Sequence, residues 1–190
     1  MAVETSTFSL PLGTPLPDLT LPDLDGNCVS LAQLRGSAIL VVVFACNHCP
    51  YVRHVEAQLG SLAAEFAETD VRFVAICSND VDNYPDDDTA GLSDQRSRAA
   101  WNFPYLVDSD QRAALTLHAA CTPDFFAFDR RGLLAYRGAF DGSTPGNGVA
   151  VTGDSLRAAL QLLLIDRPVP EPHKPALGCG IKWLPGNEPN

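Results

Sequence analysis

Hydrophobic residues follow two different rhythms along the first half of the chain. Residues 38–44, AILVVVF, form an unbroken apolar run rich in β-branched side chains, which is typical of a central parallel strand buried on both faces. From Tyr51 to about Glu68 the apolar residues recur at steps of three and four, which predicts an amphipathic helix. Residues 71–78, VRFVAICS, predict a second buried strand. We therefore expect a parallel strand–helix–strand unit in this part of the chain.

Weaker patterns predict further elements around this unit. The Pro-, Gly- and Asp-rich residues 11–27 predict an ordered N-terminal extension. The other expected elements are a helical turn at 30–36, helices around 94–101, 110–120 and 153–165, a strand at 103–109 and a β-hairpin at 124–138. These elements predict a three-layer α/β/α sandwich with a mixed central sheet. We expect one domain over residues 1–190, in which residues 167–190 form an irregular C-terminal tail packed on the body.

Composition and charge narrow the class of partner. The chain has 190 residues, of which 46% are hydrophobic, and this suits one globular domain. Its net charge of −10, from 23 acidic and 13 basic side chains, argues against binding nucleic acid or an anionic membrane. No apolar run approaches the roughly 20 residues that span a bilayer, and the N-terminus lacks the features of a secretory signal. We expect a cytoplasmic protein that is a monomer or a weak homodimer.

The strongest chemical signal is the segment FACNHCPYV, residues 44–52, directly after the first buried strand. A Cys-x-x-Cys pair at such a strand–helix junction is typical of a redox centre. We expect Cys46 at the N-terminal end of the helix and Cys49 in its first turn, where free N–H groups and the helix dipole stabilise a thiolate. This predicts Cys46 as the nucleophile and Cys49 as the resolving thiol. The imidazole of His48 would lower the pKa of Cys46 further and make the pair more oxidising than thioredoxin.

Two other interpretations of the cysteine pair stay open at this point. The pair can be half of a zinc site, and the further ligands would then come from Cys121, Cys179, His54 and His118. The pair can also be two ordinary buried thiols. We assign no metal site, because no second Cys-x-x-Cys exists. We also expect the acidic run Asp86–Asp88 to be a solvated loop, since it lacks the alternating spacing of calcium ligands.

Two long stretches of the chain carry a family resemblance. Residues 12–52 contain a proline–aspartate strand and an L..LRG turn before the cysteine pair, and residues 103–138 contain a Thr-Pro before a hairpin strand. Both resemble the thioredoxin-fold redoxins of the AhpC/TSA and TlpA-like group, over roughly residues 10–165. The tail segment GCGIKW resembles that of a bacterial subgroup of thioredoxin-family proteins.

The resemblance implies a thioredoxin-like fold and several site residues. Pro123 would be a cis-proline that faces the Cys46–Cys49 pair, and a bound peptide would add as an extended strand beside it. Thr122 would offer its backbone groups to that peptide, and Asn47 is a further candidate for substrate contact. The implied function is a thiol–disulfide oxidoreductase that acts on protein or small-molecule disulfides. It would need no bound cofactor, only an electron donor such as thioredoxin, glutathione or a reductase.

The chain also departs from the family pattern. Peroxidases of this family carry a Pro-x-x-x-Thr-x-x-Cys loop, and neither Cys46 nor Cys49 follows such a proline and threonine. Thioredoxin has a buried acid six residues before its first cysteine, where this chain has Leu40, so Glu56, Asp80 or a solvent path would have to substitute. The alternatives to the oxidoreductase are therefore a thiol peroxidase and a metal-binding or thiol-sensing module.

Two further cysteines are candidates for a redox role. Cys121 directly precedes the Thr-Pro pair, which would place it near the active site, although a small buried residue at a helix end would look the same. Cys179 stands between two glycines in the tail. We hypothesise that the tail folds back over the active-site face and brings Cys179 close to Cys121 or to the CNHC pair; the alternative is an inert surface tail.

Overall fold

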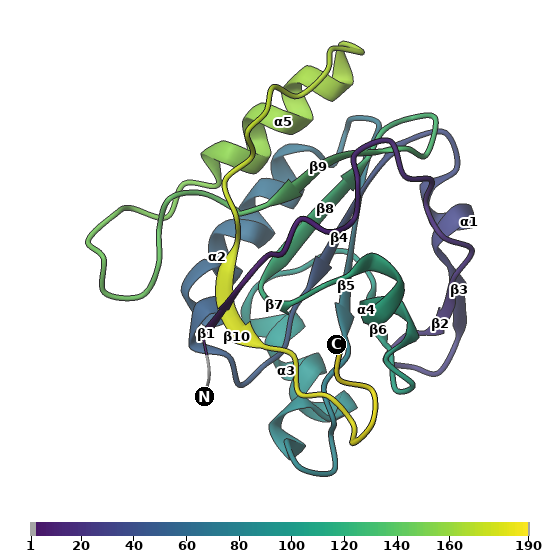
Figure 1. The fold of residues 1–190 in the computed structure, drawn as a ribbon, viewed down its shortest axis with the longest axis vertical. Coiled ribbons are helices and arrows are strands. Elements are labelled where there is room, and N and C mark those ends of the chain that lie inside the picture. The colour runs from purple at the N-terminus through teal and green to yellow at the C-terminus, as the bar shows by residue number, and fades with distance from the viewer. Residues whose placement is uncertain (1–2, 190) are drawn as a thin grey trace.

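The computed structural model describes residues 3–189, and its centre is a mixed five-stranded sheet in the order β6-β5-β4-β8-β9 (Figure 1). The strands are β4 (Ile39–Phe44), β5 (Val71–Cys77), β6 (Tyr105–Val107), β8 (Asp124–Phe128) and β9 (Leu134–Gly138). Strands β4, β5 and β6 are parallel, whereas β8 runs antiparallel to both β4 and β9. The predicted mixed central sheet is confirmed.

Helices cover both faces of this sheet. The helices are α1 (Leu31–Arg35), α2 (Pro50–Glu65), a short 3₁₀ helix η1 (Pro85–Asp87), α3 (Thr89–Arg98), α4 (Arg112–Leu117) and α5 (Asp154–Leu164). Val41 and Val43 of β4 belong to the same core cluster as α2 and α5, and Leu40 and Val42 belong to the cluster of α1 and α4. Successive strand residues point to opposite faces, so a strand between two helical layers has to be apolar throughout. The three-layer arrangement is therefore confirmed.

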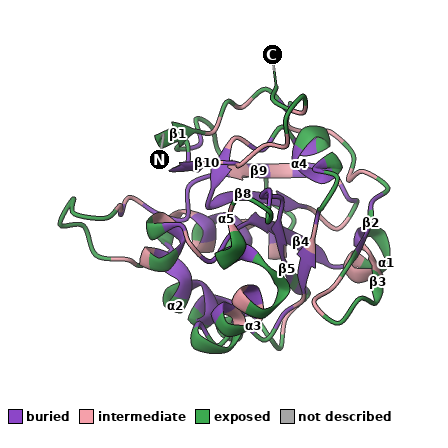
Figure 2. Cartoon of the chain, turned by 90° about the horizontal axis from the view of Figure 1, so that it is seen from below, coloured by how far each residue is buried: buried purple, intermediate pink, exposed green. Residues whose placement is uncertain are grey.

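The buried residues concentrate in this central sheet, whereas the outer faces of the helices are exposed (Figure 2). All six residues of β4 are buried, as expected for the middle strand of the sheet. Within residues 3–189, no helix has both the length and the apolar character that crossing a bilayer requires.

A second sheet joins the two ends of the chain. The strands β1 (Val3–Thr5), β10 (Leu177–Gly180) and β7 (Cys121–Thr122) pair antiparallel in the order β1-β10-β7, and we call them the terminal sheet. Figure 1 shows the yellow β10 beside the purple β1. The prediction of an irregular tail is wrong at residues 177–180, because pairing with β7 makes this segment a strand. A hairpin of β2 (Thr20–Pro22) and β3 (Cys28–Ser30) lies in the predicted N-terminal extension.

Helix α3 differs from its sequence-based boundaries in a way that matters for the site. It spans residues 89–98 instead of about 94–101. The carboxylate of Asp88 accepts a hydrogen bond from the Gly91 N–H at 2.7 Å, so that it caps the helix five residues earlier than the periodicity predicts. Helix α3 and the preceding η1 therefore reach the loop between β4 and α2.

Candidate functional site

Both cysteines of the CNHC motif lie in the loop between β4 and α2, and the exposed fraction of each is 0%. Helix α2 begins at Pro50, a residue that suits the first helical position because no hydrogen-bond acceptor is available there for an N–H. Cys49 is the N-cap of the helix, so the expectation that Cys46 begins the helix is wrong by three residues. The free N–H groups of the first turn therefore lie at Cys49.

Thr122, at the end of β7, touches both sulfurs. Sγ of Cys46 lies 3.3 Å from Oγ1 of Thr122, and the Cys49 thiol donates to the carbonyl oxygen of Thr122 at 3.1 Å. The peptide bond between Thr122 and Pro123 is cis, as the resemblance implies. The cysteine pair therefore faces the segment to which the resemblance assigns peptide binding.

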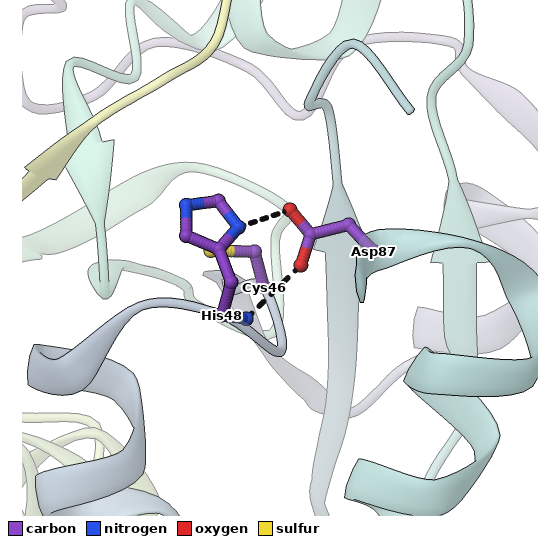
Figure 3. Close-up of side chains that lie close together, drawn as sticks. All are labelled: Cys46, His48 and Asp87. Carbon is purple, nitrogen blue, oxygen red and sulfur yellow. Dashed lines mark hydrogen bonds and ion pairs between the residues drawn. The ribbon is translucent and has the colours of Figure 1, made fainter. Parts of the chain in front are cut away.

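The side chain of Asp87, in η1, holds the middle of the CNHC loop (Figure 3). Its carboxylate accepts hydrogen bonds from the N–H groups of Asn47 and His48, at 2.8 and 3.1 Å. It also accepts from Nδ1 of His48 at 2.6 Å and from the side-chain amide of Asn79 at 2.8 Å. Burial raises the pKa of Asp87, but these bonds, led by the one from His48, hold that pKa below its usual value. The prediction of a solvated acidic loop is thus wrong for Asp87, which is buried and anchors the motif.

The same carboxylate orients the imidazole of His48. Because Nδ1 faces Asp87, this nitrogen carries the proton and donates, which leaves the lone pair on Nε2. Nε2 is buried and has no hydrogen-bond partner among residues 3–189. A ring nitrogen of His48, an oxygen of Asp87 and the sulfur of Cys46 all lie within 4.8 Å of one another (Figure 3). An oriented imidazole beside Cys46 can accept and return the thiol proton.

The two thiols of the motif differ in their preferred protonation. Burial raises the pKa of Cys46, and its hydrogen bond to Cys49 and the nearby carboxylate of Asp87 raise it further. The pKa of Cys49 is lowered, chiefly by the hydrogen bond from Cys46 and then by bonds from Cys179, Thr122 and the helix N–H. The directions of the two pKa shifts are thus the reverse of those expected from the sequence, which predicted a low pKa for Cys46.

Asn47 bonds within the protein and not toward a substrate. Its amide nitrogen donates to the carbonyl oxygen of Asp86 at 3.0 Å, and its amide oxygen accepts from Arg98 at 2.9 Å. Arg98 also forms two hydrogen bonds to the carboxylate of Glu56, at 2.8 and 3.1 Å. These bonds contribute to the position of the loop, and a contact of Asn47 with a substrate stays a prediction. Gln95 of α3 also helps to position the loop, because its amide donates to the carbonyl oxygen of Cys46 at 3.2 Å.

Sequence reasoning missed Asp87, Gln95 and Arg98. They lie in the segment between β5 and β6, about 40 residues or more along the chain from the motif, as the sequence numbering shows. The one available signal was the run of three aspartates, which the structure splits: Asp87 turns inward, whereas Asp86 and Asp88 are exposed. Of the candidate substitutes for the thioredoxin acid, Glu56 is paired with Arg98 and Asp80 accepts from Asn83 at 2.6 Å.

The structure brings Cys179 to the motif and leaves Cys121 apart from it. Cys179 lies opposite Thr122 in the terminal sheet and belongs to the same buried cluster as Cys46 and Cys49. The sulfur of Cys121 lies 3.8 Å from the carbonyl oxygen of Pro123. All six cysteines of the chain are free thiols, and only Cys28 is exposed.

Cys46, His48 and Asp87 are also the one group of three potential metal ligands in the described part of the chain. A thiolate, an imidazole and a carboxylate are ligands that zinc accepts. The hydrogen bond between His48 and Asp87, however, already joins two of the three, so a metal would have to replace it. The further zinc ligands considered from the sequence, at Cys121, Cys179, His54 and His118, do not belong to this group. The arrangement therefore suits the orientation of His48 better than the binding of a metal.

A cavity of about 360 Å³ lies next to the cis-proline. Its walls include Tyr51 and His54 of α2, Pro123, and Leu177 of β10. The Nε2 atom of His54 is buried and has no hydrogen-bond partner among residues 3–189. The cavity lies between α2 and the terminal sheet, and neither Cys46 nor Cys49 is among its lining residues.

A mixed sheet covered on both faces, with a Cys-x-x-Cys loop between its middle strand and α2 and a cis-proline opposite, defines a thioredoxin-fold redoxin. The family model described as AhpC/TSA family matches residues 12–137. The chain belongs to the AhpC/TSA family, as the resemblance implied.

Relatives of this chain carry names that differ in the reaction. An uncharacterised conserved protein from Geobacillus kaustophilus has a solved structure that superposes with a TM-score of 0.94, at 45% identity over 98% of both chains. A Mycobacterium tuberculosis protein named as a peroxiredoxin is 30% identical over 61% of this chain and 68% of its own length. The thiol:disulfide interchange protein DsbE of Yersinia pestis is 32% identical over 68% of this chain and 65% of its own length. The names of the last two relatives have thiol redox chemistry in common.

Proposed function

We propose that this protein is a thiol–disulfide oxidoreductase whose redox centre is the Cys46–Cys49 pair. The observation that carries the proposal is the shared contact of the two sulfurs: both touch Thr122 beside the cis-proline, at 3.3 Å for Cys46 and 3.1 Å for Cys49. A pair of free thiols in bonding reach, one of which is stabilised as a thiolate, is what disulfide exchange requires. The similarity to DsbE supports the same chemistry.

The electrostatics of the site favour Cys49, and not Cys46, as the attacking group. The Cys49 thiolate attacks one sulfur of a substrate disulfide, so that a mixed disulfide forms and the other half of the substrate leaves as a thiolate. Cys46 then gives up its proton, for which Nε2 of His48 is an available acceptor. The Cys46 thiolate attacks Sγ of Cys49, the Cys46–Cys49 bond forms, and the second substrate thiolate leaves. The substrate gains two electrons, and the protein loses two.

The reverse reaction uses the same groups, so the direction depends on the potentials of the partners. The chemistry needs no bound cofactor, only a dithiol or a reductase that restores the reduced pair. We therefore propose disulfide-bearing proteins or small molecules as substrates, and thioredoxin, glutathione or a reductase as the electron donor. A cytoplasmic location would be compatible with such a donor.

The test is a redox titration of the chelator-treated protein across a series of glutathione ratios, with mass-spectrometric mapping of the disulfides at each step. We expect a Cys46–Cys49 bond that forms and breaks reversibly at one midpoint, above the value of about −270 mV of thioredoxin. Cys28→Ser is the matched control, because it removes an exposed thiol outside the site and should leave the midpoint unchanged. If Cys46 and Cys49 fail to pair at every ratio, the proposed function is wrong.

The attacking thiol can be identified by alkylation. In brief exposures of the reduced protein to iodoacetamide over a range of pH, we expect Cys49 to be modified at lower pH than Cys46, because the thiolate is the reactive form. Modification of Cys46 first would restore the order of attack that the sequence suggests.

A thiol peroxidase is the second candidate function, and the similarity to the M. tuberculosis protein named as a peroxiredoxin favours it. Hydrogen peroxide would then oxidise Cys49, the N-cap of α2, to a sulfenic acid. Cys46 would attack this sulfenic acid and form the Cys46–Cys49 disulfide. Stopped-flow oxidation by hydrogen peroxide distinguishes the two functions. A peroxidase reacts far faster than an unactivated thiol, whereas an exchange enzyme does not.

A further inference from the structure

The C-terminal strand occupies the edge at which the resemblance expects a peptide substrate. β10 pairs antiparallel with β7, and Cys179 lies directly opposite Thr122. Side chains of directly paired residues point to the same face of a sheet. The Cys179 side chain therefore lies on the same face as the Thr122 side chain, whose hydroxyl group touches the sulfur of Cys46.

The contact reaches the redox centre itself. Cys179 belongs to the same buried cluster as Cys46 and Cys49, only 2% of it is exposed, and its thiol helps to lower the pKa of Cys49. Cys49 thus has two thiol neighbours, Cys46 and Cys179. Cys121 differs, because it lies opposite Gly180 and projects to the other face of the strand.

Two features fix the tail in this position. A Cβ atom on Gly178 would lie 2.0 Å from the carbonyl oxygen of Thr122, so only a glycine allows β10 to approach β7 this closely. Beyond the strand, the N–H of Lys182 donates to the side chain of Asn79 at 2.9 Å, and the Lys182 carbonyl oxygen accepts from the Asp80 N–H at 2.9 Å. The Cys179 thiol is therefore held against Cys49 by the fold and does not reach it by chance from a loose tail.

We propose that Cys179 is a third redox-active thiol, which exchanges with the Cys46–Cys49 disulfide at the sulfur of Cys49. This inference rests on the proposed function, which supplies that disulfide. The thiolate of Cys179 attacks Sγ of Cys49, the Cys49–Cys179 bond forms and the Cys46–Cys49 bond breaks. The electron pair leaves on Sγ of Cys46, which takes up a proton in place of the one that Cys179 has lost. No net oxidation occurs, and the exchange ties the terminal sheet covalently to the redox centre.

The test uses Cys46→Ser, which leaves Cys179 as the thiol neighbour of Cys49. The variant is oxidised across the same glutathione series as the wild type, and its disulfides are mapped by mass spectrometry. We expect the Cys49–Cys179 bond as the main product. The same bond should form in Cys46→Ser/Cys121→Ser, which is the matched control for an equally buried thiol on the neighbouring strand. Cys46→Ser/Cys179→Ser should stop at a mixed disulfide of Cys49 with glutathione.

The outcomes separate this inference from the proposed function. If the wild type forms Cys46–Cys49 but Cys46→Ser remains reduced or bound to glutathione, the proposed redox role of Cys179 is wrong. The proposed oxidoreductase function is then still supported. If Cys46→Ser forms Cys49–Cys179 but the wild type never forms Cys46–Cys49, Cys179 is redox-active, but the proposed pair is wrong and the exchange, which needs that disulfide, is wrong with it. The wild type gives a second measurement that needs no variant of the pair: both bonds should be present, and Cys179→Ser should remove only the Cys49–Cys179 bond.

Discussion

Asp87 and Asp124 are buried aspartates on two sides of the cysteine pair, and their pKa values move in opposite directions. The exposed fraction of each residue is 1%, and burial raises the pKa of any carboxyl group. Asp87 accepts four hydrogen bonds of 2.6 to 3.1 Å, which more than offset burial. Asp124 accepts a short bond from the Ser6 hydroxyl at 2.7 Å and a long one from the Ala120 N–H at 3.4 Å. Burial therefore prevails and raises the pKa of Asp124 to about 7.

The difference shows that the number of hydrogen-bond donors, together with the depth of burial, decides whether a buried carboxyl group is charged. It also separates two regions of the molecule. Asp87 anchors the CNHC loop as an ion. Asp124 lies beneath the terminal sheet, where the Ser6 oxygen that donates to it also accepts from the Ala176 N–H at 3.1 Å. The CNHC loop is thus held by the charged carboxylate of Asp87. The terminal sheet is held by the carboxyl group of Asp124, which is neutral only below about pH 7.

The largest expected effect is a loss of stability at high pH that depends on Asp124. Its pKa is raised from 3.8 in the unfolded chain to about 7, so its contribution is complete below about pH 4 and is lost as the pH rises through 7. Between pH 5 and 8 the wild type should lose about 3 kcal/mol of unfolding free energy for this reason. Asp124→Asn stays neutral and should not show this loss. Urea unfolding of both proteins at each pH measures the difference.

Other groups titrate in the same range, so the informative quantity is the difference between the two pH profiles. A variant profile that runs parallel to that of the wild type would show that Asp124 is already ionised at pH 5. Asp87 and Asp124 would then both be charged, and the proposed difference between the CNHC loop and the terminal sheet would be wrong.

Asp87→Ala should cost about 2 kcal/mol of unfolding free energy at pH 7, because it leaves buried donors of Asn47, His48 and Asn79 without an acceptor. The sign of the pH dependence is opposite to that of Asp124. The pKa of Asp87 is lowered, so its stabilisation is present above the unfolded value of 3.8 and is lost as the pH falls through the folded pKa. Thermal unfolding at pH 7 measures the loss of stability in Asp87→Ala. Unfolding at pH 3 to 4 tests whether that loss becomes smaller as Asp87 of the wild type is protonated.

The neighbouring Asp86→Ala is the matched control for this variant. Asp86 is exposed and contributes its backbone carbonyl oxygen to the loop, which the substitution retains. We expect its effect to stay within about 0.5 kcal/mol. Equal effects of the two substitutions would show that the anchor depends on the acidic charge of the segment and not on the bonds of Asp87.

The same comparison shows how far the sequence predicts the site. The run at 38–44 and the helix after it were sufficient to place Cys46 and Cys49 between a buried strand and a helix, because apolar periodicity is a local signal. The cis bond before Pro123 came from the family resemblance and is present. The N-cap of α2 was missed because Cys-x-x-Cys spacing alone does not decide which cysteine begins the helix.

The two anchoring carboxyl groups were not predicted, for a physical reason. The pKa of Asp87 and that of Asp124 depend on donors brought from distant segments, and a single sequence carries no record of those contacts. The terminal sheet was anticipated only as a tail that folds back. The glycine before Cys179 was a usable signal, because close approach of two backbones requires a residue without a side chain.

A smaller effect is expected where the terminal sheet is loosened without a change of charge. Gly178→Ala places a Cβ atom 2.0 Å from the backbone of Thr122 and should cost about 1.5 kcal/mol. If Cys49 becomes accessible when β10 separates from β7, the rate of its alkylation should rise about tenfold. Gly180→Ala is the control, since its Cβ atom meets only the flexible side chain of Glu4, at 2.9 Å. Equal alkylation rates in both variants would show that Cys49 is reached by another path.

The smallest expected effect is a coupling between the two regions. Nζ of Lys182, which follows β10, lies 5.6 Å from the centroid of the Tyr84 ring, and Tyr84 stacks on His48. A cation over an aromatic face at a partly exposed site contributes about 0.5 kcal/mol. A double-mutant cycle of Lys182→Met and Tyr84→Leu should therefore give a coupling energy of about this size in the unfolding free energy.

The cycle also has a redox measurement. The terminal sheet and the Asp87 region can both act on the cysteine pair through the contact of Lys182 with Tyr84. In that case the double variant should shift the redox midpoint potential of the Cys46–Cys49 bond by less than the sum of the two single shifts. Arg157→Ala is the control, because it removes an exposed ion pair with Glu65 that is outside both regions. Strictly additive shifts would mean that the tail influences the pair only through Cys179 and Thr122, because no second path through Tyr84 would then be needed.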